Sequence, residues 1–94
     1  MKKIDVYDYR VGEKEHHTLS AEIQDTGVLV LSGYDCGPSV EKFFGDFDYE
    51  YWLTVKAENV PSVLLNLIKD SFKSNVEFKK WLKDKGIPFD FKSF

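Results

Sequence analysis

The fold is decided by residues 31–55, LSGYDCGPSVEKFFGDFDYEYWLTV. This stretch runs from the end of an apolar strand through a loop that contains Gly37 and Gly45 into a strand rich in aromatic and acidic side chains. Short loops of this kind connect neighbouring strands of an antiparallel sheet. The segment therefore predicts the middle of such a sheet, and it contains no catalytic motif.

Strands are predicted wherever apolar and polar residues alternate with a period of two. The predicted strands span residues 3–11, 16–24, 28–34 and 47–56. Residues 28–34 are apolar on both sides, which favours a central strand. The loop at residues 35–46 can hold one helical turn, because Pro38 suits an early helical position and Gly45 suits a helix end.

The alternation also predicts which side chains share a face of the sheet. One face collects polar residues and one tryptophan, namely Thr18, Ser20, Glu22, Asp48, Glu50 and Trp52. The opposite face collects apolar and aromatic residues, namely Leu19, Ala21, Ile23, Phe47, Tyr49, Tyr51, Leu53 and Val55.

Beyond residue 56 the spacing of apolar residues becomes helical. A first helix is predicted from an N-cap at Asn59 to Phe72, and a second helix begins at a Ser74–Glu77 capping box and stops at Gly86. Residues 87–93 alternate again and predict a last strand. Pro88 has no N–H to donate, so we expect this strand at an edge of the sheet.

The predicted fold class is α+β, with the order ββββααβ along the chain. With 94 residues, the chain is expected to form a single domain over residues 1–94. The simplest packing is an antiparallel sheet with the two helices packed on one face. The other face would then be open to solvent.

Charge is distributed unevenly along the chain. The net charge is −3 overall, and residues 35–55 contribute −4 whereas residues 56–94 contribute +3. An acidic balance disfavours nucleic acid as a partner and favours a basic protein. The single cysteine excludes an internal disulfide. The N-terminus has no apolar run, and no apolar stretch reaches membrane-spanning length. We therefore expect a cytoplasmic protein with no membrane partner. We also expect a monomer or homodimer and no cofactor.

An acidic and aromatic cluster is the strongest candidate site. A partner-binding surface is predicted from six residues: Tyr34, Asp35, Asp46, Asp48, Glu50 and Trp52. The carboxylates would attract a basic partner, and an exposed tryptophan is a frequent anchor at protein interfaces. Two other interpretations stay open, because the acids can be ordinary solvated side chains or can bind a hard cation such as Ca²⁺. Trp52 can equally pack beneath the loop at residues 35–46.

Three further residues carry reactive groups. His16 and His17 are neighbours in a predicted strand, so they point to opposite faces and do not easily share a metal ion. Cys36 is placed in the loop after the third strand, and it would need a nearby base to act as a nucleophile. Structural roles are the simplest interpretation of all three residues, and no catalytic residue and no metal ligand is predicted from them.

The segment YDCG…FFGDFDYEYWLTV resembles a family of uncharacterised small bacterial α+β proteins. The similarity covers about half of the chain and is carried by a D-x-G…G-x-x-x-YEY-like motif, here Asp35, Gly37, Gly45, Tyr49, Glu50 and Tyr51. Some proteins of this kind are suspected immunity proteins, which neutralise a secreted bacterial toxin. The resemblance implies no catalytic residue and no cofactor.

The function predicted from these observations is that of a non-enzymatic protein-binding module with an acidic and aromatic sheet face. An immunity-like inhibitor of a basic bacterial toxin is its most concrete form. Two alternatives remain: a small metal-dependent hydrolase that uses the carboxylates near residues 35–50, and a homo-oligomeric structural protein that buries the same face.

Overall fold

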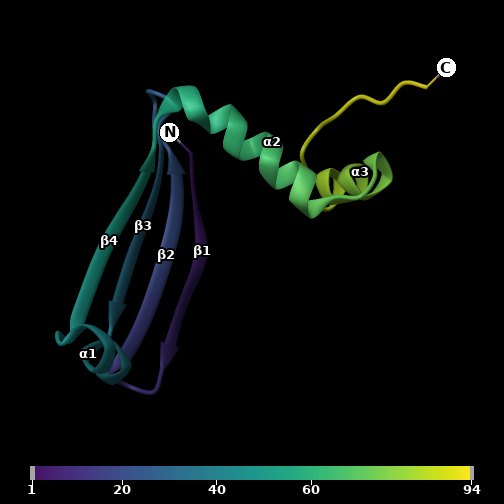
Figure 1. The fold of residues 1–94 in the computed structure, drawn as a ribbon. Helices are drawn as coiled ribbons and strands as arrows, with labels where there is room; N and C mark the ends of the chain where they lie inside the picture. The colour runs from purple at the N-terminus through teal and green to yellow at the C-terminus, as the bar shows by residue number, and fades with distance from the viewer. Residues whose placement is uncertain (1, 94) are drawn as a thin grey trace. The chain divides into compact units, whose positions relative to one another are not determined.

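The computed structural model in Figure 1 describes residues 2–93, with the backbone alone at residue 44. The elements are β1 (Lys2–Val11), β2 (Glu15–Ile23), β3 (Leu29–Cys36), α1 (Pro38–Phe44), β4 (Asp48–Val55), a 3₁₀ turn (Ala57–Asn59), α2 (Val60–Ser71) and α3 (Asn75–Asp84). The α+β class and the antiparallel sheet are confirmed. The predicted order ββββααβ is wrong, because the observed order is βββαβαα.

The four strands form an antiparallel meander in the order β1-β2-β3-β4 (Figure 1). Residues 28–34 were expected to supply a central strand, and β3 does lie between β2 and β4. It extends two residues further than predicted, so Asp35 and Cys36 belong to the strand and not to the following loop. The register of β1 on β2 shifts between Asp5 and Tyr7, which marks a bulge in this edge strand.

The strand register confirms the predicted division of side chains between two faces. We call one side the polar face; it carries Asp8, His16, Thr18, Ser20, Glu22, Ser32, Tyr34, Asp48, Glu50 and Trp52. We call the other side the tyrosine face; it carries Tyr7, Tyr9, His17, Leu19, Leu31, Asp35, Tyr49, Tyr51 and Leu53. Phe47, predicted on the latter, precedes the first residue of β4.

One glycine is required on the tyrosine face because an aromatic ring occupies its side-chain space. Gly33 lies opposite Tyr51 in the β3–β4 register, and a β-carbon at Gly33 would lie 2.0 Å from Cζ of Tyr51. The Tyr51 ring thus covers the glycine backbone. A hydrogen bond with Tyr7 raises the pKa of Tyr51 to about 12, which links the two edge strands across this face.

A second glycine lets β3 turn into α1 close to the start of β2. Gly37 has φ +130, a backbone conformation that residues with a β-carbon rarely adopt, and such a carbon would lie 2.1 Å from Cγ of Glu15. Pro38 then occupies the first turn of α1, and Gly45 ends the helix in a left-handed conformation, as predicted. Helix α1 brings Val40 to 4% exposure, the lowest among the described hydrophobic residues.

The chain divides into two compact units at residues 60 and 61, and the second unit contains α2 and α3. Its centre is an aromatic cluster in which the ring of Phe72 meets Phe78 and Trp81 edge-on, with centroids 4.9 Å and 5.9 Å apart. The predicted pair of Ser74 and Glu77 caps α3, with one departure from a standard capping box. Ser74 Oγ accepts from the Glu77 N–H, and Glu77 Oε2 accepts the N–H of Lys73, the residue before the cap, in place of that of Ser74.

The last strand predicted at residues 87–93 is not observed, and these residues follow α3 without regular structure. Alternation alone does not make a strand, because a strand needs a partner to satisfy its N–H and C=O groups. Pro88 also removes one donor. Phe91 is instead held within the second unit by Lys79, whose Nζ lies 3.6 Å from the ring centroid.

The prediction that both helices cover one face of the sheet stays a prediction, as does that of a single domain over residues 1–94. Among residues 2–93, no helix has the length and apolar character needed to cross a membrane.

Candidate functional site

The polar face contains a hollow formed by two neighbouring rows of the strand register. One row runs Thr18–Tyr34–Glu50 across β2, β3 and β4, and the next runs Ser20–Ser32–Trp52. The three short hydroxyl side chains form a low floor, whereas Tyr34, Glu50 and Trp52 rise beside it. The volume of this hollow is about 280 Å³. A water molecule takes up about 30 Å³ in the liquid, so a side chain of a partner can enter.

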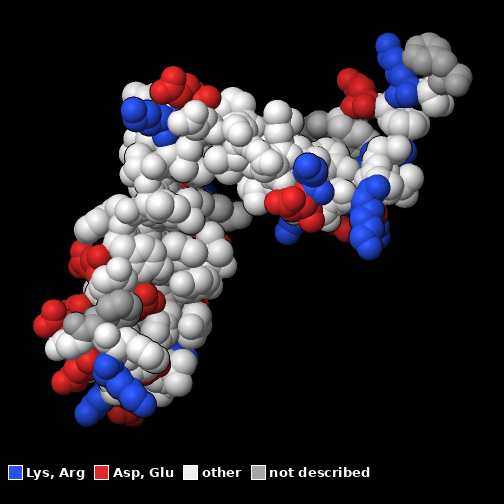
Figure 2. Space-filling view, viewed as in Figure 1, with Lys and Arg blue, Asp and Glu red and all other residues white. Residues whose placement is uncertain are grey.

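Trp52 is the most unusual residue at this hollow because it is 67% exposed. A large aromatic side chain left in solvent has apolar area available for a partner. The carboxylate of Glu50 lies in the neighbouring row of the same strand. Figure 2 shows acidic side chains gathering along the visible β4 side of the sheet. The combination of an exposed indole and adjacent carboxylates favours a positively charged ligand.

Tyr34 and Asp48 form a fixed pair beside the hollow. The Tyr34 hydroxyl donates to Oδ1 of Asp48 over 2.9 Å. This hydrogen bond raises the pKa of Tyr34 to about 12, because the carboxylate accepts from the neutral phenol and repels the phenolate. The phenol therefore stays neutral near pH 7, and the negative charge of Asp48 is held at one end of the hollow.

The structure brings together four of the six residues predicted for partner binding. Tyr34, Asp48, Glu50 and Trp52 lie on the polar face. Asp35 does not join them, because β3 continues through this position and the alternation of side chains places it on the tyrosine face. Asp46 precedes β4, so of the three predicted acids Asp46, Asp48 and Glu50 only the last two belong to the strand.

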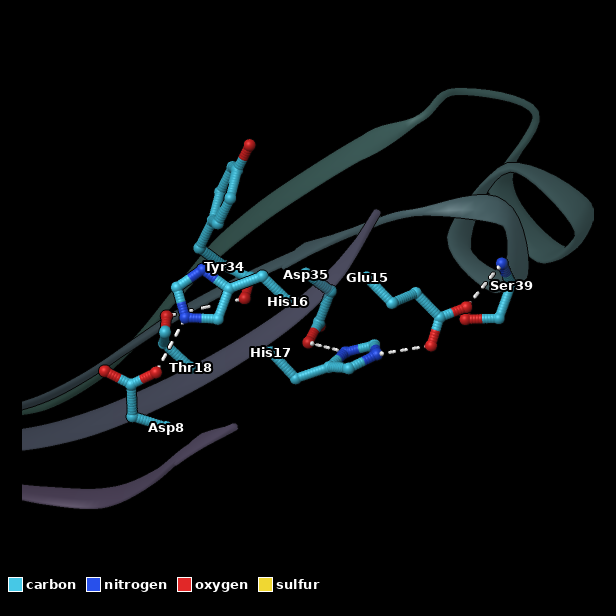
Figure 3. A network of polar contacts seen from close by, with 8 residues as sticks. All are labelled: Asp8, Glu15, His16, His17, Thr18, Tyr34, Asp35 and Ser39. Atoms are coloured by element: carbon cyan, nitrogen blue, oxygen red, sulfur yellow. Dashed lines mark hydrogen bonds and ion pairs between the residues drawn. The ribbon is translucent and has the colours of Figure 1, made fainter. Parts of the chain in front are cut away.

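Asp35 belongs instead to a second polar network, at the α1 end of the sheet (Figure 3). Nδ1 of His17 lies 2.7 Å from Oδ1 of Asp35, and Nε2 of the same ring lies 3.2 Å from Oε2 of Glu15. The other oxygen of Glu15 accepts the backbone N–H of Ser39 over 3.0 Å, at the start of α1. The network connects β2, β3 and α1 through one imidazole ring.

Both ring nitrogens of His17 face carboxylate oxygens, and both can donate only when the ring is a cation. The hydrogen bonds with Asp35 and Glu15 accordingly raise the pKa of His17 above its ordinary value of 6.5. The pKa of Glu15 is lowered, chiefly by its hydrogen bonds with Ser39 and also by its bond with His17. The ring of Tyr9 lies 5.1 Å from the His17 ring and covers one side of it.

His16 leaves β2 on the opposite side from His17, as predicted for neighbouring residues of a strand (Figure 3). Its Nε2 lies 2.6 Å from Oδ1 of Asp8 on β1. Cys36 was predicted to lie in a loop, which is wrong: it is the last residue of β3, half-buried and opposite His16 in the register. Within the described residues 2–93, no group of three or more His, Cys, Asp or Glu side chains is placed to hold one metal ion.

Sequence reasoning missed the hydroxyl floor of the hollow and the His17 network. Both depend on which residues of different strands lie opposite one another. The two-residue separation of Glu15 and His17 indicates a shared face. Their meeting with Asp35 requires the β2–β3 register, which follows from the short loop between Ile23 and Leu29.

The chain matches no model of a protein family, no curated protein and no solved structure. The arrangement of the described residues is therefore the basis for the functional proposal below.

Proposed function

We propose that this protein is a non-enzymatic binding module that recognises a basic protein through the polar face of its sheet. The observation that carries the proposal is the hollow at which exposed Trp52 and the carboxylate of Glu50 lie in adjacent rows of β4. Interface anchors are enriched in tryptophan, and carboxylates on the same surface give electrostatic complementarity to a cationic partner.

Recognition would proceed in two physical stages. The acidic side chains near β4 attract a basic surface over a distance of about 8–10 Å at moderate ionic strength, which raises the association rate. Desolvation of the Trp52 indole then holds the complex together, because burying a large aromatic ring contributes mainly to slow dissociation. The first stage is screened by salt, whereas the second stage is not.

An immunity-like inhibitor of a basic bacterial toxin is the most concrete form of this proposal. It is supported by the resemblance of the 34–55 segment to small bacterial α+β proteins and by the acidic balance of residues 35–55. An inhibitor of this kind needs a stable surface and no reacting groups. The cytoplasm, where such a protein would meet an incoming toxin, is its proposed location.

The binding proposal is tested by capture from lysate of the native host with charge-matched baits. The variant Glu50→Lys reverses a charge at the hollow, whereas Glu58→Lys makes the same change in the 3₁₀ turn after β4. We expect a basic protein to be retained by wild type and Glu58→Lys and to be lost with Glu50→Lys. Equal retention by all three baits would contradict binding through the polar face.

A second pair of baits tests the aromatic anchor. Trp52 and Leu53 are neighbours in β4, are 67% and 58% exposed, and lie on opposite faces. Trp52→Ala should release the captured protein, whereas Leu53→Ala should retain it.

The alternative that the protein is a homo-oligomer is tested by its mass in light scattering. A metal-dependent hydrolase is distinguished by a melting temperature that rises with Mg²⁺, Mn²⁺, Ca²⁺ or Zn²⁺.

A further inference from the structure

We infer that the hollow on the polar face is a receptor for the guanidinium group of an arginine side chain on the partner protein. This inference rests on the proposed function, and it names the chemical group that the site recognises. It follows from three properties of the lining residues: an exposed aromatic ring, a carboxylate without a hydrogen bond within the described residues, and a floor of hydroxyl oxygens.

The aromatic wall suits a flat cation. Trp52 lies in the row Ser20–Ser32–Trp52, where both neighbours are small, so one side of its ring is left uncovered above the floor. The indole ring is the best aromatic partner for a cation, and arginine is the side chain that most often supplies it. A guanidinium is planar and weakly hydrated, so it stacks on the ring and loses less hydration than an ammonium group.

The carboxylate wall completes the charge balance. Glu50 is exposed at the edge of the hollow, and neither of its carboxylate oxygens has a hydrogen bond or ion pair among the described residues. A free carboxylate of this kind can accept two parallel N–H bonds from one guanidinium. Asp48 differs from Glu50, because one of its oxygens already accepts from Tyr34. It contributes negative potential, and Glu50 contributes the direct contact.

The floor supplies acceptors for the remaining N–H groups. The Thr18 hydroxyl lines the hollow and donates to the backbone oxygen of Tyr34 over 3.4 Å, so its lone pairs remain available as acceptors. Ser20 and Ser32 lie side by side in the next row and can rotate their hydroxyl groups to accept as well. A guanidinium carries five N–H donors and no acceptor, which matches a site with one carboxylate and three hydroxyl oxygens.

The basic residues of the sheet are placed away from this site. On the polar face Lys3 and Arg10 belong to β1, which is separated from β4 by two strands. The two rows of the hollow therefore contain no lysine or arginine, and the rows beside them carry Lys3 and Arg10 only at their β1 ends. An incoming cation is attracted by Glu50 and Asp48 on β4, and two strands separate these carboxylates from Lys3 and Arg10 on β1.

Trp52 itself reports on occupation of the hollow. The chain has two tryptophans, Trp52 and Trp81. The substitution Trp81→Phe, made in the second unit, leaves Trp52 as the sole indole fluorophore. The probe is the capped peptide acetyl-Gly-Arg-Gly-amide. The comparison peptide contains citrulline, which has nearly the shape of arginine but no charge, and a third peptide contains lysine.

We expect the arginine peptide to change the emission of Trp52 saturably, with an affinity at least about 10-fold higher than that of the citrulline peptide. The lysine peptide should bind more weakly than the arginine peptide, because an ammonium neither stacks nor bonds in a bidentate manner. Glu50→Gln should remove about 10-fold in affinity. Glu22→Gln, which changes an acid of the same face outside the hollow, should leave the affinity unchanged.

An equal response to arginine and citrulline, or no response to arginine, would overturn the inference. Far-UV circular dichroism of each variant checks that the sheet is intact. The peptide experiment can fail while the proposal of binding through the polar face holds. If Glu50→Lys loses a basic protein from lysate while the arginine peptide has no effect, the arginine receptor is refuted and binding through the polar face stands.

Discussion

The ring of Tyr51 lies directly over Gly33, so that a β-carbon on the glycine would be 2.0 Å from Cζ of the tyrosine. The two residues are opposite one another in β3 and β4. Glycine weakens a strand when nothing replaces its missing side chain. Here an aromatic ring from the neighbouring strand fills the space, and its hydroxyl reaches Tyr7 on the far edge of the sheet.

This contact predicts the effect of Gly33→Ala. The added methyl group overlaps the Tyr51 ring, which must move and lose its bond with Tyr7. We expect the free energy of unfolding to fall by about 1–3 kcal/mol, the usual effect of overpacking. Chemical denaturation measures it. In a Tyr51→Val background the ring is absent, so Gly33→Ala should have little effect. An equal loss in both backgrounds would show that the Tyr51 ring is not the cause.

His17 predicts a pH dependence of stability. Its pKa is raised in the folded state by Asp35 and Glu15, so the folded protein binds the proton more tightly than the unfolded chain does. The stabilisation is fully present below the ordinary histidine pKa of 6.5, and it is lost as the pH rises through the folded-state pKa. The difference in free energy of unfolding between wild type and His17→Gln should therefore be largest below pH 6.5 and shrink as the pH rises above it.

Glu15 acts in the opposite direction, since its pKa is lowered and its stabilisation is lost as the pH falls through its folded-state pKa. If the effect of His17→Gln were constant over the range, the imidazolium would not be the stabilising form.

The Tyr34–Asp48 pair predicts a change in the ionisation of a phenol. Asp48→Asn removes the charge that accepts from Tyr34, so the pKa of Tyr34 should fall from about 12 towards its ordinary value of 10.0. A titration of ¹³C-labelled tyrosine Cζ shifts measures this. Asp46→Asn removes the same charge just before β4 and should leave the Tyr34 shift unaltered. A Tyr34 pKa that does not respond to Asp48→Asn would argue against the hydrogen bond.

Ser74 predicts the stability of the second unit. Its hydroxyl accepts the N–H of Glu77 and caps α3. Ser74→Ala should reduce the free energy of unfolding by about 0.5–2 kcal/mol, the range typical of lost N-caps. Thermal unfolding followed by circular dichroism measures the loss. Ser93→Ala, outside any helix or strand, serves as the control and should have no effect.

Local sequence patterns were sufficient to predict the start and end of a helix, because a helix bonds most of its backbone N–H and C=O groups within itself. The Ser74–Glu77 box and the helix end at Gly86 are local signals, and both are confirmed. The strand predicted at residues 87–93 shows the limit of such patterns. Alternating side chains are consistent with a strand, but its N–H and C=O groups need a neighbouring strand, which no local pattern supplies.

The candidate site shows the same limit at the level of single residues. Alternation within β4 correctly placed Asp48, Glu50 and Trp52 on one face of the sheet. The end of β3 was predicted two residues too early, so Asp35 was grouped with these residues although it lies on the tyrosine face. A strand continued by one residue moves the next side chain to the opposite face. The hydroxyl floor required the register of three strands, which is a property of the folded sheet.

The central claim is that the polar face of the sheet contacts a partner protein in the cell. It is tested most directly by photo-crosslinking with p-benzoylphenylalanine, placed at position 52 in one variant and at position 53 in another. These neighbouring positions are both exposed and lie on opposite faces. We predict that irradiation of native host cells yields a discrete adduct of higher mass from position 52 and none from position 53. An adduct from position 53 alone, or none from either, would contradict the claim.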